Sequence, residues 1–284
     1  MAPTLPLDLQ EVICTLALGN KVNDRFAFVA MTVCKAWAYF ICSMLYRNYE
    51  IKEYVKFVDF VKTVTSPNTL FPYGNFVRSI DFTAVNRYGI DMRAYKLIAC
   101  CKNLFTMTLG HPTSLRPNTF RLMAETCKRL QTLHMGGLGD HPFILECDFS
   151  GMEALRTIEI YTTALAAESI KTLPRSVEHV RLIQVDTIND DDLKSFLNGR
   201  SALQSLVLDD CRFIRGPIAE MIEPLTGLKK LVLRGSNIDD DSLQGLDKLP
   251  FELDTLRIAY TRVSPAFLET LTAGQLKVRR LEIS

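Results

Sequence analysis

The stretch Leu203-Gln204-Ser205-Leu206-Val207-Leu208 spells L-x-x-L-x-L, and this spacing of aliphatic residues recurs along the chain. Nine copies, some with conservative aliphatic replacements, begin at residues 77, 104, 130, 155, 177, 203, 228, 253 and 278. Successive copies lie 22 to 27 residues apart. Because alternate residues of a strand face opposite sides, each copy predicts a short strand with one aliphatic side and one exposed side. A strand phrase at a nearly constant period indicates a solenoid of stacked repeats.

The residues between the strand phrases read as helices. Asn189 and the acidic run 190–192 precede apolar residues at helical spacing, which is typical of a capped helix start. The same phrase returns at residues 238–246 and more loosely at 263–271, where Pro265 suits a first helical position. Alternating strands and helices at this period predict a horseshoe with strands on its concave side and helices on its convex side.

The repeats resemble the cysteine-containing subfamily of leucine-rich repeats. Cys101 and Cys127 stand three residues before the leucines that open two strand phrases, and Ile238-Asp239 with Leu243 matches the helix phrase with one extra residue. The resemblance implies an α/β fold, a right-handed horseshoe of about nine repeats over residues 75–284. The ninth repeat is incomplete, since it holds only its strand phrase. An uncovered terminal strand is a pairing hazard, so we expect something to cover it, either a partner or further chain.

The first 48 residues differ from the repeats and are similar to an F-box. Leu5-Pro6-Leu7-Asp8-Leu9 opens the segment, and Val33-Cys34-Lys35-Ala36-Trp37 closes it after an aliphatic helix. Asp8 replaces the usual Glu, and residues 19–23 depart from the common loop. An F-box implies a helical domain that docks on a Skp adaptor. The docking residues implied by the match are Leu5, Pro6, Leu7, Leu9, Val12, Ile13, Leu16, Val33, Cys34 and Trp37.

Residues 49–74 connect the two parts. Apolar residues at helical spacing predict a helix from Glu53 to Val64, which Ser66 and Pro67 end. The entry at residues 73–78 resembles that of fungal F-box proteins with leucine-rich repeats. We expect this linker helix to pack on both neighbours and stiffen the junction.

The exposed positions of the strand phrases predict a partner-binding concave face. Those positions become charged toward the carboxyl end, with a small excess of basic residues, so an acidic or phosphorylated partner is one interpretation and ordinary solvated charges are the other. The candidate substrate-binding residues are Arg156, Tyr161, Arg181, Lys230, Arg234, Arg257 and Arg280.

No motif in the sequence predicts catalysis, a cofactor or a metal site. The acidic triplets 190–192 and 239–241 lack the spacing of a calcium loop, so we interpret them as helix caps. The four histidines, at 111, 134, 141 and 179, have no partner at zinc spacing. The glycines at 136, 137 and 139 lack the following residues of a phosphate loop.

Charge and cysteine usage bound the environment. The formal charge of +1 gives no bulk attraction to nucleic acid or anionic membranes. A membrane span at residues 26–46 is disfavoured by Lys35. Eight cysteines without a C-x-x-C pair favour a reducing compartment, the cytoplasm or the nucleus.

The combined resemblance implies a non-catalytic substrate receptor of a Skp-cullin-F-box ubiquitin ligase, which binds the adaptor, and through it cullin, by the F-box and a protein substrate by the concave face. A leucine-rich-repeat scaffold without ligase output is the alternative. A GTPase-activating horseshoe is a more distant third.

Overall fold

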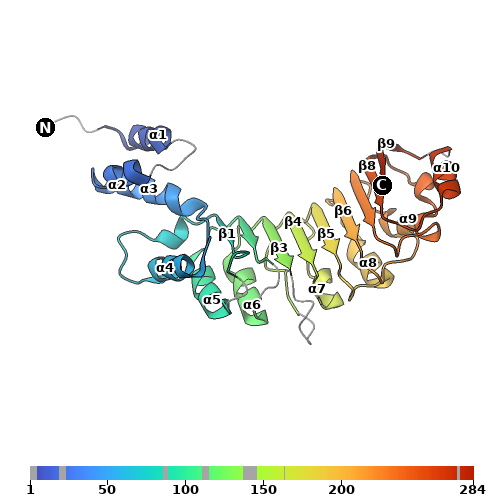
Figure 1. The fold of residues 1–284 in the computed structure, drawn as a ribbon, viewed down its shortest axis with the longest axis horizontal. Helices are drawn as coiled ribbons and strands as arrows, with labels where there is room; N and C mark the ends of the chain where they lie inside the picture. Colours follow the sequence, from blue (N-terminus) through green and yellow to red (C-terminus); the bar gives the residue numbers. More distant parts are fainter. Residues whose placement is uncertain are drawn as a thin grey trace.

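The computed structural model describes residues 5–18, 24–85, 89–110, 115–136, 146–162, 164–273 and 276–284. Three parts follow one another along the chain: a helical amino-terminal unit, a junction and a long curved solenoid (Figure 1). The predicted glycine loop at 137 and 139, His111 and His141 lie outside the described residues.

One sheet of nine parallel strands runs the length of the solenoid in sequence order. The strands are β1 (Ser79–Asp81), β2 (Thr106–Thr108), β3 (Thr132–Gly136), β4 (Thr157–Tyr161), β5 (His179–Ile183), β6 (Ser205–Asp209), β7 (Lys230–Arg234), β8 (Leu253–Ala259) and β9 (Val278–Ile283). Each strand coincides with one L-x-x-L-x-L phrase, and Leu206, Leu231 and Leu256 are successive register partners. The predicted α/β solenoid with concave strands and convex helices is therefore confirmed (Figure 1).

The aliphatic residues of β1 to β8 lie in one continuous core, whereas in β9 Val278 and Leu281 are partly buried and Ile283 is 49% exposed. Leu206, Leu231 and Leu256 are each fully buried, and the same cluster extends from Ile51 to Leu271. Burying a leucine of this kind contributes roughly 1.5 to 3 kcal/mol. Stability is thus distributed along the solenoid, because each repeat covers the apolar side of its neighbour.

The convex side carries helices of unequal length. They are α5 (Asp91–Cys100), α6 (Pro117–Thr126), α7 (Ala167–Lys171), α8 (Asp190–Leu197), α9 (Ile218–Ile222) and α10 (Pro265–Ala273). The predicted cap of α8 is confirmed as a capping box, in which Asn189 accepts from the Asp192 amide and Asp192 accepts from the Asn189 amide. Pro265 is the first residue of α10, as predicted.

One expectation for the convex side is wrong, and a second is tested only over part of its range. Residues 238–246 do not form an α-helix but two short 3₁₀ turns, η3 (Asp241–Leu243) and η4 (Leu246–Lys248). Gly245, with φ of 80°, separates the turns, because a left-handed residue cannot continue an α-helix. Between β3 and β4, the described residues 146–156 contain no helix.

Acidic residues at the helix starts also join successive repeats. The Asp190 carboxylate accepts from the amides of Arg215 and Gly216 in the next repeat. Asp240 accepts in the same way from the Ser264 amide and hydroxyl, at 2.7 Å each. These carboxylates hold neighbouring repeats in register on the convex side.

Arg200, the one buried arginine among the described residues, connects neighbouring repeats in the middle of the solenoid. Arg200 is 5% exposed and donates to the carbonyls of Phe196, Pro174 and Leu173 at 2.7 to 2.8 Å. Its guanidinium carbon lies 4.1 Å from the Phe196 ring centroid. Burial, with a smaller contribution from Arg175, lowers the pKa of Arg200 to about 10.

The amino-terminal unit contains α1 (Leu7–Leu18), α2 (Asp24–Met31) and α3 (Lys35–Arg47). Its own small core consists of Cys14, Leu18, Ala27, Ala30 and Ile41. The apolar run at 26–46 is divided between α2 and α3, and no helix among the described residues is long and apolar enough to cross a bilayer.

The junction is built from α4 (Tyr54–Thr65) and a set of stacked aromatic rings. Phe57, Phe60 and Val61 of α4 belong to the solenoid core, so α4 serves as the first convex helix. From the other side, Tyr46 of α3 stacks on Tyr73 at 4.7 Å, and Tyr49 stacks on Phe60 at 4.2 Å between ring centroids. Such rings in contact on both sides resist bending between the helical unit and the solenoid.

Candidate functional site

The amino-terminal unit exposes an unusual amount of apolar side chain. We call this the N-terminal apolar surface. Its members are Leu5, Leu7, Leu9, Val12, Ile13, Leu16, Phe28, Val29 and Val33, each at least 40% exposed.

The cause is the composition of α1 and α2. Helix α1 is apolar on nearly every side, yet only Cys14 and Leu18 of its residues are buried in the small core. Leu16 is 76% exposed and Phe28 is 71% exposed. So many exposed large apolar side chains on one small helical unit are typical of a protein interface, because burying them against a partner is favourable.

Nearly all of the predicted docking residues lie on or beside this surface. The seven aliphatic ones are exposed, as are Pro6 and Cys34. Trp37 differs, because it is half-buried and packs against the small core. A change at Trp37 therefore perturbs the folding of the unit as well as its surface.

Phe28 and Val29 belong to the surface, but sequence reasoning missed them. The spacing of small and bulky residues in α2 could have indicated that they are exposed. Ala27 and Ala30 face the small core, at 2% exposure each, so the bulky residues between them must face outward.

The second candidate surface is the concave side of the sheet, where three side chains of each longer strand point away from the core. The pairing register of the strands aligns the middle one of these three side chains in a row that crosses the sheet. That row reads His134, Glu159, Arg181, Val207, Val232, Arg257 and Glu282 from β3 to β9. A ligand crossing the strands would meet these side chains in order.

Most of the predicted basic residues are engaged in ion pairs across neighbouring strands. The pairs are Arg181 with Glu159 at 3.3 Å, Arg234 with Asp209 at 3.4 Å, and Arg257 with Glu282 at 3.8 Å. Arg280 pairs with Glu282 at 2.8 Å within β9 itself. Arg156 precedes β4 and pairs with Glu178 at 3.4 Å. Among the described residues, Lys230 has no carboxylate within salt-bridge distance, although it is exposed. The excess of positive charge expected from the sequence is therefore reduced but not removed.

Aromatic side chains lie at the carboxyl ends of the strands. Tyr161 ends β4, 37% exposed, beside Gly136 of β3. Tyr260 follows β8, is 65% exposed, and lies under the Arg234 guanidinium, 4.6 Å from its ring centroid. Sequence reasoning did not select Tyr260, because it lies two residues after its L-x-x-L-x-L phrase, one further than Tyr161 and Arg234.

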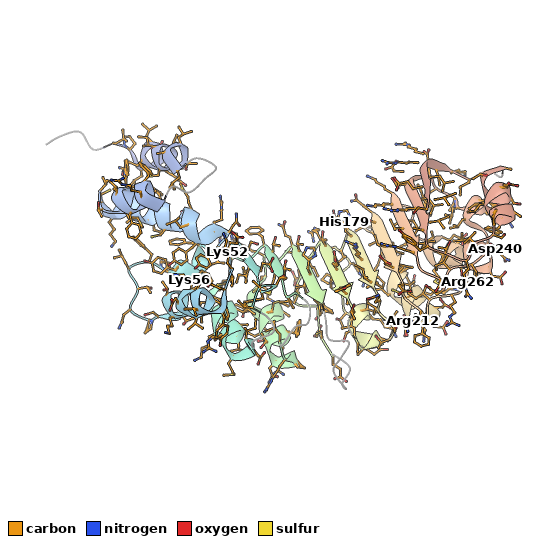
Figure 2. The ribbon with its side chains drawn as sticks, in the orientation of Figure 1. Lys52, Lys56, His179, Arg212, Asp240 and Arg262 are labelled. Carbon is orange, nitrogen blue, oxygen red and sulfur yellow. The ribbon has the colours of Figure 1, made fainter. Side chains whose placement is uncertain are left out.

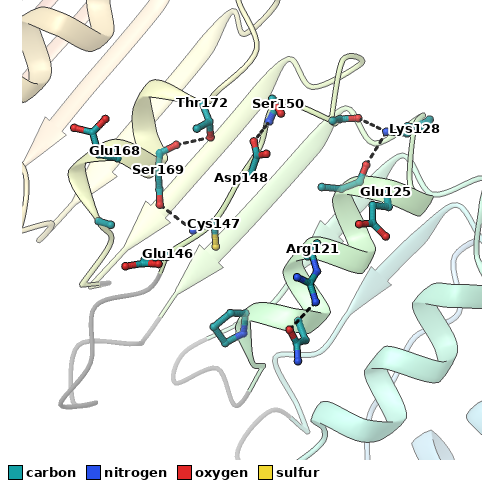
Figure 3. Close-up of a pocket in the computed structure, with 15 residues that line it drawn as sticks. Arg121, Glu125, Lys128, Glu146, Cys147, Asp148, Ser150, Glu168, Ser169 and Thr172 are labelled. Atoms are coloured by element: carbon teal, nitrogen blue, oxygen red, sulfur yellow. Dashed lines mark hydrogen bonds between the residues drawn. The ribbon is translucent and has the colours of Figure 1, made fainter.

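A cavity of about 610 Å³ opens on the convex side between α6 and α7 (Figure 3). Arg121, Glu125 and Lys128 of the α6 region face Glu168 and Ser169 of α7 across it. Lys128 donates to the carbonyls of Ala124 and Gly151, so its ammonium is held in the wall. The lining has charges of both signs and no group suited to a particular ligand.

The described residues give no geometric support for catalysis. Within the described ranges no cluster of three or more His, Cys, Asp or Glu side chains is placed to hold a metal ion. His134 lies 3.5 Å from Glu159, in the concave ion-pair series, and His179 is exposed on β5 (Figure 2). Both surfaces are suited to binding proteins.

Comparison with known proteins adds little to this geometry. No family model and no curated protein matches the chain. Among solved structures, the chain is similar to an internalin (InlF) of Listeria monocytogenes, with 12% identity and a TM-score of 0.46, over 75% of this chain and 64% of the internalin. It is also similar to internalin C2 of the same organism, with 11% identity and a TM-score of 0.43, over 86% of this chain and 96% of that one. Likeness at this level carries no conclusion about function.

Proposed function

We propose that this chain is the substrate-recognition subunit of a Skp-cullin-F-box ubiquitin ligase. The observation that carries the proposal is the N-terminal apolar surface. The residues that match the F-box motif are, with the exception of Trp37, the ones that the helical unit leaves exposed. A fold that needed these side chains for its own stability would bury them.

In this proposal the two surfaces have separate tasks. The N-terminal apolar surface docks on the Skp adaptor, and the concave face holds a protein substrate. The chain itself is not an enzyme and needs no cofactor. It raises the effective concentration of a substrate lysine near the conjugating enzyme, which is a proximity effect.

The junction suits that task. Tyr46, Tyr49, Phe60 and Tyr73 join the helical unit to the solenoid through stacked rings. A stiff junction fixes the direction in which the concave face points relative to a bound adaptor. We place the protein in the cytoplasm or the nucleus, where its eight free thiols remain reduced.

Co-expression with a Skp adaptor, followed by size-exclusion chromatography, tests the proposal. We expect a stoichiometric complex for the unmodified chain and none for the double variant Leu7→Asp, Leu16→Asp. Val55→Asp and Met92→Asp are matched controls, because both residues are apolar and about as exposed, at 66% and 67%, but lie on α4 and α5. The controls should keep the complex.

A chain that remains alone beside the adaptor would overturn the proposal. If the complex forms, reconstitution with cullin and a conjugating enzyme distinguishes a receptor from a scaffold. A receptor supports ubiquitin transfer to a protein bound on the concave face, whereas a leucine-rich-repeat scaffold without ligase output binds that protein and leaves it unmodified.

A further inference from the structure

The concave face contains a small apolar patch on β5, β6 and β7. Val207 and Val232 are register partners on β6 and β7, and Ile183 ends β5 opposite Asp209, two residues after Val207. All three are half-buried. We call this set the valine saddle. The other concave positions of β5 to β8 hold polar or charged side chains, except for Ala259.

Arginines stand at both ends of the saddle. The register row runs Arg181, Val207, Val232, Arg257 across β5 to β8. Each arginine has its acidic partner on the outer side, away from the valines. Glu159 lies on β4 and Glu282 lies on β9. The ion pairs thus draw both guanidinium groups outward and leave the valines uncovered.

The saddle lies in a locally basic environment. Lys230 and Arg234 are on β7, two residues before and after Val232. The concave positions of β5 to β8 carry four basic side chains and a single carboxylate, Asp209, which is 17% exposed and paired with Arg234. Lys230 is the basic group left without an acidic partner among the described residues.

We infer that the valine saddle binds an extended segment of the partner in which one apolar side chain is flanked, two residues away on each side, by acidic side chains. This inference rests on the proposed use of the concave face for substrate. The apolar side chain would cover Val207 and Val232, and the two acidic side chains would reach Arg181 and Arg257.

The spacing of the sheet supports this pattern. Three strand intervals of about 4.8 Å separate Arg181 from Arg257, roughly 14 Å in all. In an extended segment, side chains four residues apart lie on one face at about 13 Å, and the residue midway between them shares that face. One acidic-x-apolar-x-acidic segment therefore matches the row from arginine to arginine.

The existing ion pairs of Arg181 and Arg257 do not prevent these arginines from binding a carboxylate of the ligand. The side chains of Arg181 and Arg257 are 49% and 47% exposed, and exposed pairs of this kind contribute at most about 1 kcal/mol. Because a guanidinium has several donors, a second carboxylate can join the first. The charges mainly set selectivity, while the apolar contact supplies affinity.

Selection from a phage-displayed library of random dodecapeptides on the full chain tests the inference. We expect the enriched peptides to share an acidic-x-apolar-x-acidic core. Binding of the best peptide, measured by fluorescence polarisation, should fall about tenfold or more in Val232→Glu and in the double variant Arg181→Glu, Arg257→Glu. The charge-matched control is Lys56→Glu, Lys62→Glu, with both residues on α4, and it should bind unchanged. Figure 2 shows Lys56 away from the concave strands.

The absence of a consensus, a basic consensus, or equal binding by the saddle variants and the control would each overturn the inference. Arg181 and Arg257 are exposed, so reversing their charges should not unfold the chain, and melting curves verify this. Adaptor binding is measured in parallel on every variant. Loss of adaptor binding with an intact consensus would refute the ligase proposal alone, whereas adaptor binding without a consensus would refute the saddle alone.

Discussion

Thr162 and Gln184 occupy equivalent places in successive repeats, and the Thr162 hydroxyl lies 2.9 Å from Gln184 Oε1. Both residues have positive φ, 43° and 51°. Asp210 and Tyr260 repeat this conformation, and Gly235 takes the same place after β7. The left-handed turn lets each backbone amide donate to the carbonyl of the next strand, as Asp210 does to Arg234 at 2.7 Å. The backbone strain at these left-handed residues is offset by the hydrogen bonds that their amides make to the next strand.

Replacing Asp210 with glycine should stabilise the protein slightly, because this residue has the same left-handed backbone and, among the described residues, no side-chain hydrogen bond to lose. Relief of about 1 to 2 kcal/mol of left-handed strain is partly cancelled by about 0.5 to 1 kcal/mol of extra chain entropy, which leaves a gain of about 0.5 kcal/mol. Gly235→Ala should instead cost about 2 kcal/mol, because a Cβ there would lie 2.7 Å from Asn237 Oδ1. Urea unfolding of the two variants should give opposite signs. Equal effects would contradict the strain described for the row.

Removing the Arg200 guanidinium should destabilise the solenoid strongly. Arg200→Met would leave the buried carbonyls of Leu173, Pro174 and Phe196 without this donor, at a cost of about 3 kcal/mol. Arg175→Met is the control, since Arg175 is exposed and only repels Arg200. Thermal unfolding measures both. A loss below about 1 kcal/mol for Arg200→Met would show that water can replace the guanidinium.

Stability should fall in alkaline solution because of the buried thiols. Burial raises the pKa of Cys127 to about 12 and that of Cys211 to about 11, from 9.0. Above pH 9 the unfolded chain therefore loses protons that the folded chain retains, and the free energy of unfolding decreases as pH rises. Each thiol accounts for a loss of about 1 kcal/mol between about pH 9 and 10.

Urea unfolding across this pH interval, compared between variants, isolates the thiol contribution. Cys127→Ala should decline less steeply than the unmodified chain. Cys34→Ala is the matched control, because Cys34 is exposed, and its decline should parallel that of the unmodified chain. Identical slopes for all three proteins would mean that groups other than the buried thiols dominate alkaline unfolding.

Phe28 should contribute to adaptor binding even though the F-box match did not select it. Phe28→Asp should weaken adaptor binding about tenfold or more without lowering the melting temperature, because its side chain is 71% exposed. Ala27→Asp, at a residue 2% exposed, should unfold the helical unit instead. Titration calorimetry measures adaptor binding by both variants, and melting curves measure their stability.

Alkylation of the exposed Cys34 thiol should be slower in the adaptor complex than in the free chain, because the adaptor would cover it. Equally rapid alkylation would place the adaptor elsewhere.

Much of the fold could be predicted from the sequence because each repeat is encoded locally. The phrase at residues 203–208 appears as β6, and the capped helix at 190–197 appears as α8. The α-helix expected at 238–246 does not form, because the backbone is extended at Gln244 and left-handed at Gly245, which the spacing of the apolar residues does not reveal. The spacing within α2 contained the signal for Phe28, but only the packing of Ala27 and Ala30 shows which side is covered.

The sequence by itself determined the strands, their order and the aliphatic side that each one buries, because a two-residue period repeated every 25 residues or so permits few other arrangements. Tertiary structure decided which charges remain available. Arg181 and Glu159 are 22 residues apart in the chain, and stacking of the repeats is what places them 3.3 Å apart. The valine saddle arises in the same way, since Val207 and Val232 become neighbours through the register of β6 and β7. Contacts between repeats depend on register and rotamer, which are properties of the assembled sheet.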